Sequence, residues 1–267
     1  MTTVRELMSL SGRRALVTGA AGGIGRVIAE TLAELGADLL LLDRPGAAYY
    51  TLTQEIKRDW EVSVQTIACD LELQEDRDQL VESVRQQDAP LNVLVNNAAF
   101  VGTTNLEGWV TDFEQQTVET WRRALEVNLT AAFDLSKGLA PLLKESAGAC
   151  IINIGSIYGS YGPDYSLYAG TTMGNPAAYA ASKGGLIQLT RWLATTLGPA
   201  VRVNTVSPGG VFRNQPETFV QRYRERTPLA RMATEDDFRG AIAYLASDLS
   251  AYVTGQNLAV DGGWGVW

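Results

Sequence analysis

The chain has 267 residues, 46% of them hydrophobic, and no linker or shift in composition divides it, so we expect one α/β domain spanning residues 1–267. Its net charge of −8 argues against nucleic acid or anionic membrane surfaces as partners, and no apolar run is long enough to span a bilayer. The sequence contains no histidine, which excludes Ser-His-Asp hydrolysis, Cys-His proteolysis and most zinc sites, so no metal site is expected.

The N-terminal residues and the two cysteines indicate the compartment. Residues 1–10 include charged side chains and lack the apolar core of a signal peptide. Cys69 and Cys150 each border a predicted strand, and we expect both to be buried, reduced thiols. We therefore expect a cytoplasmic protein.

Residues 14–36 predict a buried strand, a glycine-rich turn and a helix, in that order. The turn has the pattern Thr-Gly-x-x-x-Gly-x-Gly, with glycines at positions 19, 23 and 25. The residues that recur at helical spacing after it are Val27, Ile28, Leu32 and Leu35. A helix N-terminus has free N–H groups and a partial positive charge, and glycine lets a pyrophosphate approach the backbone closely.

Four leucines at positions 39–42 predict a second buried strand, which ends in Asp43. A carboxylate at that point can accept hydrogen bonds from both hydroxyls of a ribose. A glycine turn on its own is weak evidence, but strand, turn, helix and acid together predict a dinucleotide site.

Predicted strands and helices alternate along the rest of the chain. The further strands are expected at residues 62–68, 91–99, 149–156, 201–207 and 252–263. The further helices are expected at residues 47–59, 74–87, 118–144, 176–193 and 234–247. About seven strands alternating with helices predict an α/β fold with a doubly wound parallel sheet and helices on both faces.

The most specific pattern is a serine at a strand end followed by Tyr-x-x-x-Lys at the start of a long helix. Ser156 ends the fifth predicted strand, and Tyr179 and Lys183 lie one turn apart on the same helix face. Such a pair alone is common, but its occurrence after the glycine turn and the serine is rare by chance.

These motifs, in this order from Gly12 to Gly263, resemble those of the short-chain dehydrogenase/reductase family, in its compact, single-domain branch with a Rossmann-like fold. The chain departs from the family pattern in three places. Ala99 replaces the glycine of Asn-Asn-Ala-Gly, Arg213 stands where a threonine follows Pro-Gly, and the catalytic serine and tyrosine are unusually far apart.

The resemblance implies an NAD(P)-dependent alcohol dehydrogenase or carbonyl reductase, which interconverts a secondary alcohol and a ketone by hydride transfer. Tyr179 would exchange a proton with the substrate oxygen, and Ser156 would hydrogen-bond that oxygen. Lys183 would hold the nicotinamide ribose and, with the oxidised nicotinamide, lower the pKa of the tyrosine. Asn128, within Val-Asn-Leu, would kink its helix and hold a water of the proton relay; otherwise it is a hydrogen-bonded core residue.

The resemblance also assigns a set of cofactor contacts. They are Gly19, Gly22, Gly23, Ile24, Gly25, Asp43, Arg44, Asp70, Leu71, Asn97, Ala98, Tyr179, Lys183, Pro208, Gly209 and Val211. NAD is favoured because Asp43 would repel a 2′-phosphate and the glycine turn lacks a basic residue, while Arg44 keeps NADP open. Asp70 would bind the adenine amino group, cap the helix at 74–87, or do both.

The substrate side is less well defined. We expect a polar, tyrosine-rich substrate loop at about 157–175 and a substrate flap at about 210–233; the alternative for the loop is a surface or oligomer contact. The candidate substrate contacts are Tyr158, Tyr165, Tyr168 and Arg213. They suit a sugar or other polyhydroxylated small molecule, and Arg213 could bind either the pyrophosphate or an anionic group of the substrate.

Two alternative functions stay open. Reduction of 3-oxoacyl thioesters on acyl carrier protein is common in this branch, although the tyrosine-rich loop and Arg213 argue against it. A non-catalytic dinucleotide sensor would lack part of the catalytic set, which is complete here. The apolar residues 264–267 and the last two helices predict a subunit contact in a homotetramer.

Overall fold

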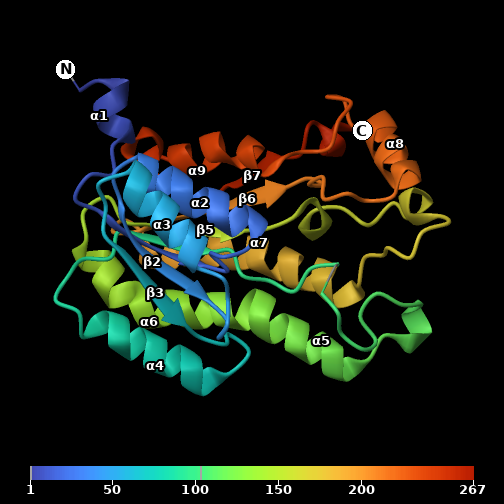
Figure 1. The fold of residues 1–267 in the computed structure, drawn as a ribbon, viewed down its shortest axis with the longest axis horizontal. Coiled ribbons are helices and arrows are strands. Elements are labelled where there is room, and N and C mark those ends of the chain that lie inside the picture. The colour runs from blue at the N-terminus through green and yellow to red at the C-terminus, as the bar shows by residue number, and fades with distance from the viewer. Residues whose placement is uncertain (1, 103) are drawn as a thin grey trace.

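The computed structural model describes residues 2–102 and 104–267, and its strands form one parallel sheet (Figure 1). The strands are β1 (Arg14–Thr18), β2 (Asp38–Asp43), β3 (Val64–Ala68), β4 (Val93–Asn96), β5 (Cys150–Ile154), β6 (Arg202–Pro208) and β7 (Asn257–Val260). Their order, β3-β2-β1-β4-β5-β6-β7, reverses between β1 and β4. This is the predicted Rossmann-like, doubly wound order, in which ligands bind at the reversal.

Helices cover both faces of the sheet, as predicted (Figure 1). One face carries α2 (Gly23–Glu34), α3 (Tyr50–Asp59) and α9 (Arg239–Ala246). The other face carries α4 (Gln74–Arg85), α5 (Val118–Leu125), α6 (Ala131–Glu145) and α7 (Ala177–Leu197). Two helices lie outside these layers, α1 (Val4–Met8) and α8 (Glu217–Arg226), and the latter lies near the C-terminus.

The leucine run of β2 shows why a strand covered on both faces is apolar throughout. Leu39 and Leu41 pack with the α2 and α9 side, whereas Leu40 and Leu42 pack with the α4 and α6 side. Successive side chains of a strand point to opposite faces, so a strand of a parallel sheet between two helix layers buries both sets of side chains and is mostly hydrophobic.

The structure refines two predicted boundaries. The predicted helix at 118–144 is interrupted by a π-helical turn at Glu126–Thr130, which contains Asn128. Of the two roles left open for Asp70, capping of the next helix is wrong, because the N-cap of α4 is Leu73, and binding of the adenine amino group stays a prediction. The carboxylate of Asp70 instead accepts a hydrogen bond from the backbone N–H of Glu72 at 3.0 Å.

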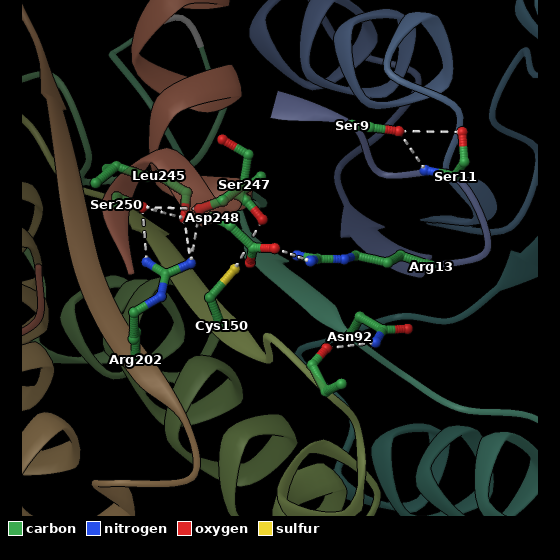
Figure 2. A network of polar contacts seen from close by, with 12 residues as sticks. Ser9, Ser11, Arg13, Asn92, Cys150, Arg202, Leu245, Ser247, Asp248 and Ser250 are labelled. Carbon is green, nitrogen blue, oxygen red and sulfur yellow. Dashed lines mark hydrogen bonds and ion pairs between the residues drawn. The ribbon is translucent and has the colours of Figure 1, made fainter. Parts of the chain in front are cut away.

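Polar contacts join the elements at the edge of the sheet where the strands begin (Figure 2). Arg13, just before β1, pairs with Asp248 at 2.5 Å, and Arg202, the first residue of β6, donates to Ser250 at 2.8 Å. Cys150 donates to a backbone carbonyl of α9, and burial raises the pKa of its thiol. These contacts fix the edge opposite the glycine turn.

Within residues 2–102 and 104–267, Cys69 and Cys150 are buried free thiols. No helix in these ranges has the length and hydropathy needed to cross a membrane. No cluster of three or more potential metal ligands occurs in the same ranges.

Candidate active site

The glycine turn between β1 and α2 is held in shape by Asn97. Its side-chain amide donates to the carbonyl oxygens of Thr18 at 2.9 Å and Gly19 at 3.1 Å. Gly19 has a φ of +64°, and a Cβ on Gly25 would overlap the carbonyl oxygen of Gly19. Side chains are therefore excluded where the chain must turn tightly. The amide of Asn97 holds the turn, which leaves its backbone to face a ligand.

A cavity of about 400 Å³ lies at the carboxyl ends of the strands, next to the reversal of strand order. Every residue predicted to contact the cofactor lines this cavity, and so do Ser156 and Arg213. Phe100, Val101 and Thr104 line it too, and they could not be predicted because they follow Asn-Asn-Ala-Ala without forming a motif of their own.

Asp43 ends β2 with its carboxylate held by two backbone groups. One oxygen accepts from the N–H of Ala21 at 2.9 Å and the other from the N–H of Arg44 at 2.8 Å. These bonds fix the carboxylate beside the glycine turn, while the exposed Arg44 also lines the cavity. Asp43 therefore presents a fixed hydrogen-bond acceptor to the cavity.

Lys183 lies under the cavity, one turn after Tyr179 on α7. Its ammonium group donates to the carbonyl oxygen of Ile154 at 2.7 Å and lies 5.9 Å from the centre of the tyrosine ring. Burial lowers the pKa of Lys183 to about 8, because a low-dielectric environment disfavours the charged form.

Burial also raises the pKa of Tyr179, while a hydrogen bond with Ser156 and the charge of Arg213 act in the opposite direction. Without a cofactor, the pKa of Tyr179 is therefore raised. We had expected Lys183 and an oxidised nicotinamide together to lower this pKa. The difference has a physical reason, since without the cofactor's charge the loss of hydration dominates. Ser156 itself is buried at the end of β5.

Asn128 is 2% exposed, and the chain itself satisfies its side-chain amide. The oxygen accepts from the N–H of Phe100 at 2.7 Å, and the nitrogen donates to Ser182 at 3.0 Å and to the carbonyl of Phe100 at 3.2 Å. Asn128 therefore braces the segment after β4 against α7. Its predicted role in a water relay stays a prediction.

The three substrate-loop tyrosines are not among the described residues that line the cavity. Tyr158 and Tyr168 share a hydrogen bond of 2.6 Å between their hydroxyls, and burial raises the pKa of Tyr168 to about 12 and that of Tyr158 as well. Tyr165 is exposed, with its ring centre 6.3 Å from that of Tyr168. The loop therefore pairs two tyrosine hydroxyls outside the lining of the cavity, and the N–H of Tyr158 donates to the hydroxyl of Ser156 at 3.2 Å.

The substrate loop packs against α8, and α8 packs against the C-terminal residues. The ring centres of Tyr168 and Phe219 are 5.4 Å apart, and Arg222 donates to the carbonyl of a loop residue at 2.5 Å. Tyr223 stacks on Trp264 at 4.6 Å, so this tryptophan is 3% exposed within a single chain. The loop, α8 and the C-terminal turn form one aromatic cluster.

The comparisons with known proteins agree with this geometry. The family model described as enoyl-(acyl carrier protein) reductase matches residues 19–265. Galactitol 2-dehydrogenase (L-tagatose-forming) of Cereibacter sphaeroides is 34% identical, covering 98% of this chain and 99% of the relative. The 3-oxoacyl-[acyl-carrier-protein] reductase of Thermotoga maritima is 32% identical, covering 96% of this chain and 99% of the relative.

A solved structure of a similar protein has the same fold. The putative NAD(P)-dependent gluconate 5-dehydrogenase of Beutenbergia cavernae, with bound NADP at low occupancy, has a TM-score of 0.85 and 34% identity, covering 98% of this chain and all of that one. The family match over nearly the whole length, the strand order and the cavity around Tyr179 lead to one conclusion: the chain belongs to the short-chain dehydrogenase/reductase family of oxidoreductases.

Proposed function

We propose that the protein is an NAD-dependent dehydrogenase that interconverts a secondary alcohol and a ketone of a sugar or other polyhydroxylated small molecule. The observation that carries the proposal is the meeting of Ser156, Tyr179 and Lys183 in one cavity with the glycine turn. A tyrosine and a lysine beside a glycine turn in one cavity suit hydride transfer, in which the protein handles only the proton.

The residues present fit a nicotinamide dinucleotide. Gly22 and Gly23 line the cavity at the start of α2 and have no side chains, so a pyrophosphate could approach the backbone there. Asp43 offers its fixed carboxylate to a ribose diol, which supports NAD over NADP. When bound, the dinucleotide would supply the hydride donor or acceptor of the reaction.

The chain's own residues would move the proton. In alcohol oxidation, the Tyr179 phenolate accepts the proton of the substrate hydroxyl, and the Ser156 hydroxyl holds that oxygen in place. The Lys183 ammonium group would hold the nicotinamide ribose, and its charge would favour the phenolate. Asn128, which holds the segment at Phe100, would keep the cavity wall in place and supply the water-linked end of the proton path.

The substrate class is argued from the loop. The hydroxyl pair of Tyr158 and Tyr168 supports a polyhydroxylated substrate. The T. maritima relative keeps reduction of 3-oxoacyl thioesters as the second candidate. A non-catalytic sensor is disfavoured, because the complete catalytic set meets in the cavity.

The proposed setting is a homotetramer of single-domain chains in the cytoplasm. Trp264 is covered within the chain, but Val266 and Trp267 remain 71% and 68% exposed, which leaves apolar surface for a subunit contact. The buried free thiols of Cys69 and Cys150 suit a reducing compartment.

The test is NADH formation from NAD⁺ with polyols, aldonates, hexose phosphates and 3-hydroxyacyl thioesters, repeated with NADP⁺. The proposal predicts turnover on a polyol, an aldonate or a hexose phosphate, with kcat/KM at least tenfold higher for NAD⁺ than for NADP⁺. Turnover on the thioesters alone would support the second candidate and overturn the proposed substrate class.

A further inference from the structure

Arg213 and Glu235 lie together over the first residue of α2. The guanidinium Nε of Arg213 lies 3.1 Å from a carboxylate oxygen of Glu235. A Cβ added to Gly23 would lie 2.8 Å from the Nη2 of Arg213 and 2.8 Å from the same carboxylate oxygen. Both charged groups therefore stand against the helix start where a pyrophosphate would bind.

The two ends of the flap hold this pair in place. Val211 bridges to Ala233 in parallel, so the segments that carry Arg213 and Glu235 leave the same point side by side. The N–H of Arg213 donates to Gln215 at 2.7 Å, which fixes its backbone.

Contacts with α2 locate the segment that carries Glu235. Thr234 and Asp237 form a capping box around it, and Arg239, which follows this short turn, pairs with Glu30 of α2 at 2.7 Å. These contacts therefore hold the backbone of Glu235 close to the start of α2.

The start of α2 lacks an anion of its own. Its N-cap, Gly22, has no side chain to accept from the first-turn N–H groups, and the first turn contains no acidic residue. Such a helix end favours a negative charge brought by another group. Without a bound cofactor, the carboxylate of Glu235 lies at this helix end.

We propose that Arg213 binds the pyrophosphate of the dinucleotide, and that Glu235 is a built-in competitor which holds Arg213 until the pyrophosphate takes its place. This inference rests on the proposed function only through dinucleotide binding. Of the two roles that the sequence left open for Arg213, it favours binding of the cofactor over binding of an anionic substrate.

The proposal predicts changes of opposite sign in affinity. Arg213→Gln removes a charged donor to the phosphates and weakens ADP-ribose binding about 10–100-fold, the range for a charge-assisted hydrogen bond. Glu235→Gln removes the competing charge and tightens ADP-ribose binding several-fold. Arg224→Gln is the matched control, since Arg224 lies on the same flap and donates to the carbonyl of Ala230 instead.

The experiment is calorimetric titration of each variant with ADP-ribose, which contains the pyrophosphate, and with adenosine, which does not. Arg213→Gln should weaken only ADP-ribose binding, and thermal melting would verify that each variant is folded. The inference is overturned if Arg213→Gln behaves like Arg224→Gln, if adenosine binding falls equally, or if Glu235→Gln weakens ADP-ribose binding.

Different results would contradict the proposed function and the inference about Arg213. A wild-type chain that binds neither ADP-ribose nor NADH contradicts dinucleotide binding itself and the inference with it. An Arg213→Gln variant that keeps its ADP-ribose affinity but raises KM for an anionic substrate overturns the inference alone and assigns Arg213 to the substrate.

Discussion

At the residue scale, the ammonium group of Lys183 is buried, and its hydrogen-bond partner among the described residues is the carbonyl oxygen of Ile154. Burial lowers its pKa from 10.5 to about 8, so keeping the ammonium group charged lowers the stability of the folded chain. A shift of this size corresponds to roughly 3 kcal/mol. The charge is kept although it lowers stability, which is typical of a group selected for chemistry.

We therefore predict that Lys183→Met abolishes turnover and raises the free energy of unfolding at pH 7 by about 2 kcal/mol, after about 1 kcal/mol is subtracted for the lost hydrogen bond. The gain should disappear as pH rises from 8 to 10.5, because above the unfolded-state pKa the lysine is neutral in both states. Urea denaturation at pH 7 and 10.5 measures both effects.

Lys137→Met, at an exposed position of α6, is the control and should change stability by less than about 0.5 kcal/mol. A Lys183→Met variant that is less stable than the wild type at pH 7 would show that the ammonium group stabilises the fold.

The identities of the candidate catalytic residues could be predicted from the sequence, but their electrostatics could not. Tyr179 and Lys183 were predicted because Tyr-x-x-x-Lys follows the glycine turn and a serine at a strand end, in the order that resembles the family. The direction of the tyrosine pKa shift depends on how much water the neighbouring segments exclude, and that is a tertiary property. The position of Glu235 over Gly23 was missed for the same reason, because it looked like an ordinary helix start.

At the element scale, two helical glycines provide a matched pair. A Cβ at Gly25 would overlap the carbonyl of Gly19, whereas a Cβ at Gly240 of α9 would meet no atom within 4 Å. We predict that Gly25→Ala weakens NADH binding at least 100-fold, because the glycine turn must move. Gly240→Ala should keep NADH affinity and stabilise the chain by up to about 1 kcal/mol.

Fluorescence titration with NADH and thermal melting of both glycine variants test this pair. Equal NADH affinity in Gly25→Ala and Gly240→Ala would mean that the turn at Gly19 does not form the cofactor site.

The hydroxyl pair of the substrate loop gives a second prediction at this scale. Tyr168→Phe removes the hydrogen-bond partner of Tyr158, and we expect KM for the sugar substrate to rise about tenfold with NADH affinity unchanged. Steady-state kinetics measure the change, with the fully exposed Tyr252→Phe as control. An unchanged KM would mean that the pair only packs the loop against α8.

The central strands β1, β2, β4 and β5 were predictable because each is a short, mostly apolar run that fits between two helix layers. The π-helical turn at Asn128 and the packing of the substrate loop on α8 were not, since both depend on contacts between residues far apart in the sequence. The loop was predicted to cover the substrate side, but its position relative to the cavity required the structure.

At the scale of the whole molecule, the exposed apolar residues at the C-terminus bear on assembly. We predict that light scattering gives a mass of four chains, and that Trp267→Ser shifts the distribution toward smaller species, because it removes exposed apolar surface from the expected contact. A wild-type monomer at micromolar concentration would contradict the homotetramer.

The central claim is that Tyr179 transfers the proton of a nicotinamide-dependent reaction without being needed to bind the dinucleotide. Its most direct test compares kcat and the NADH dissociation constant of Tyr179→Phe with those of the wild type. We predict that kcat falls by about 10²–10⁴ while the dissociation constant changes less than about twofold. A variant that turns over near the wild-type rate would contradict the account.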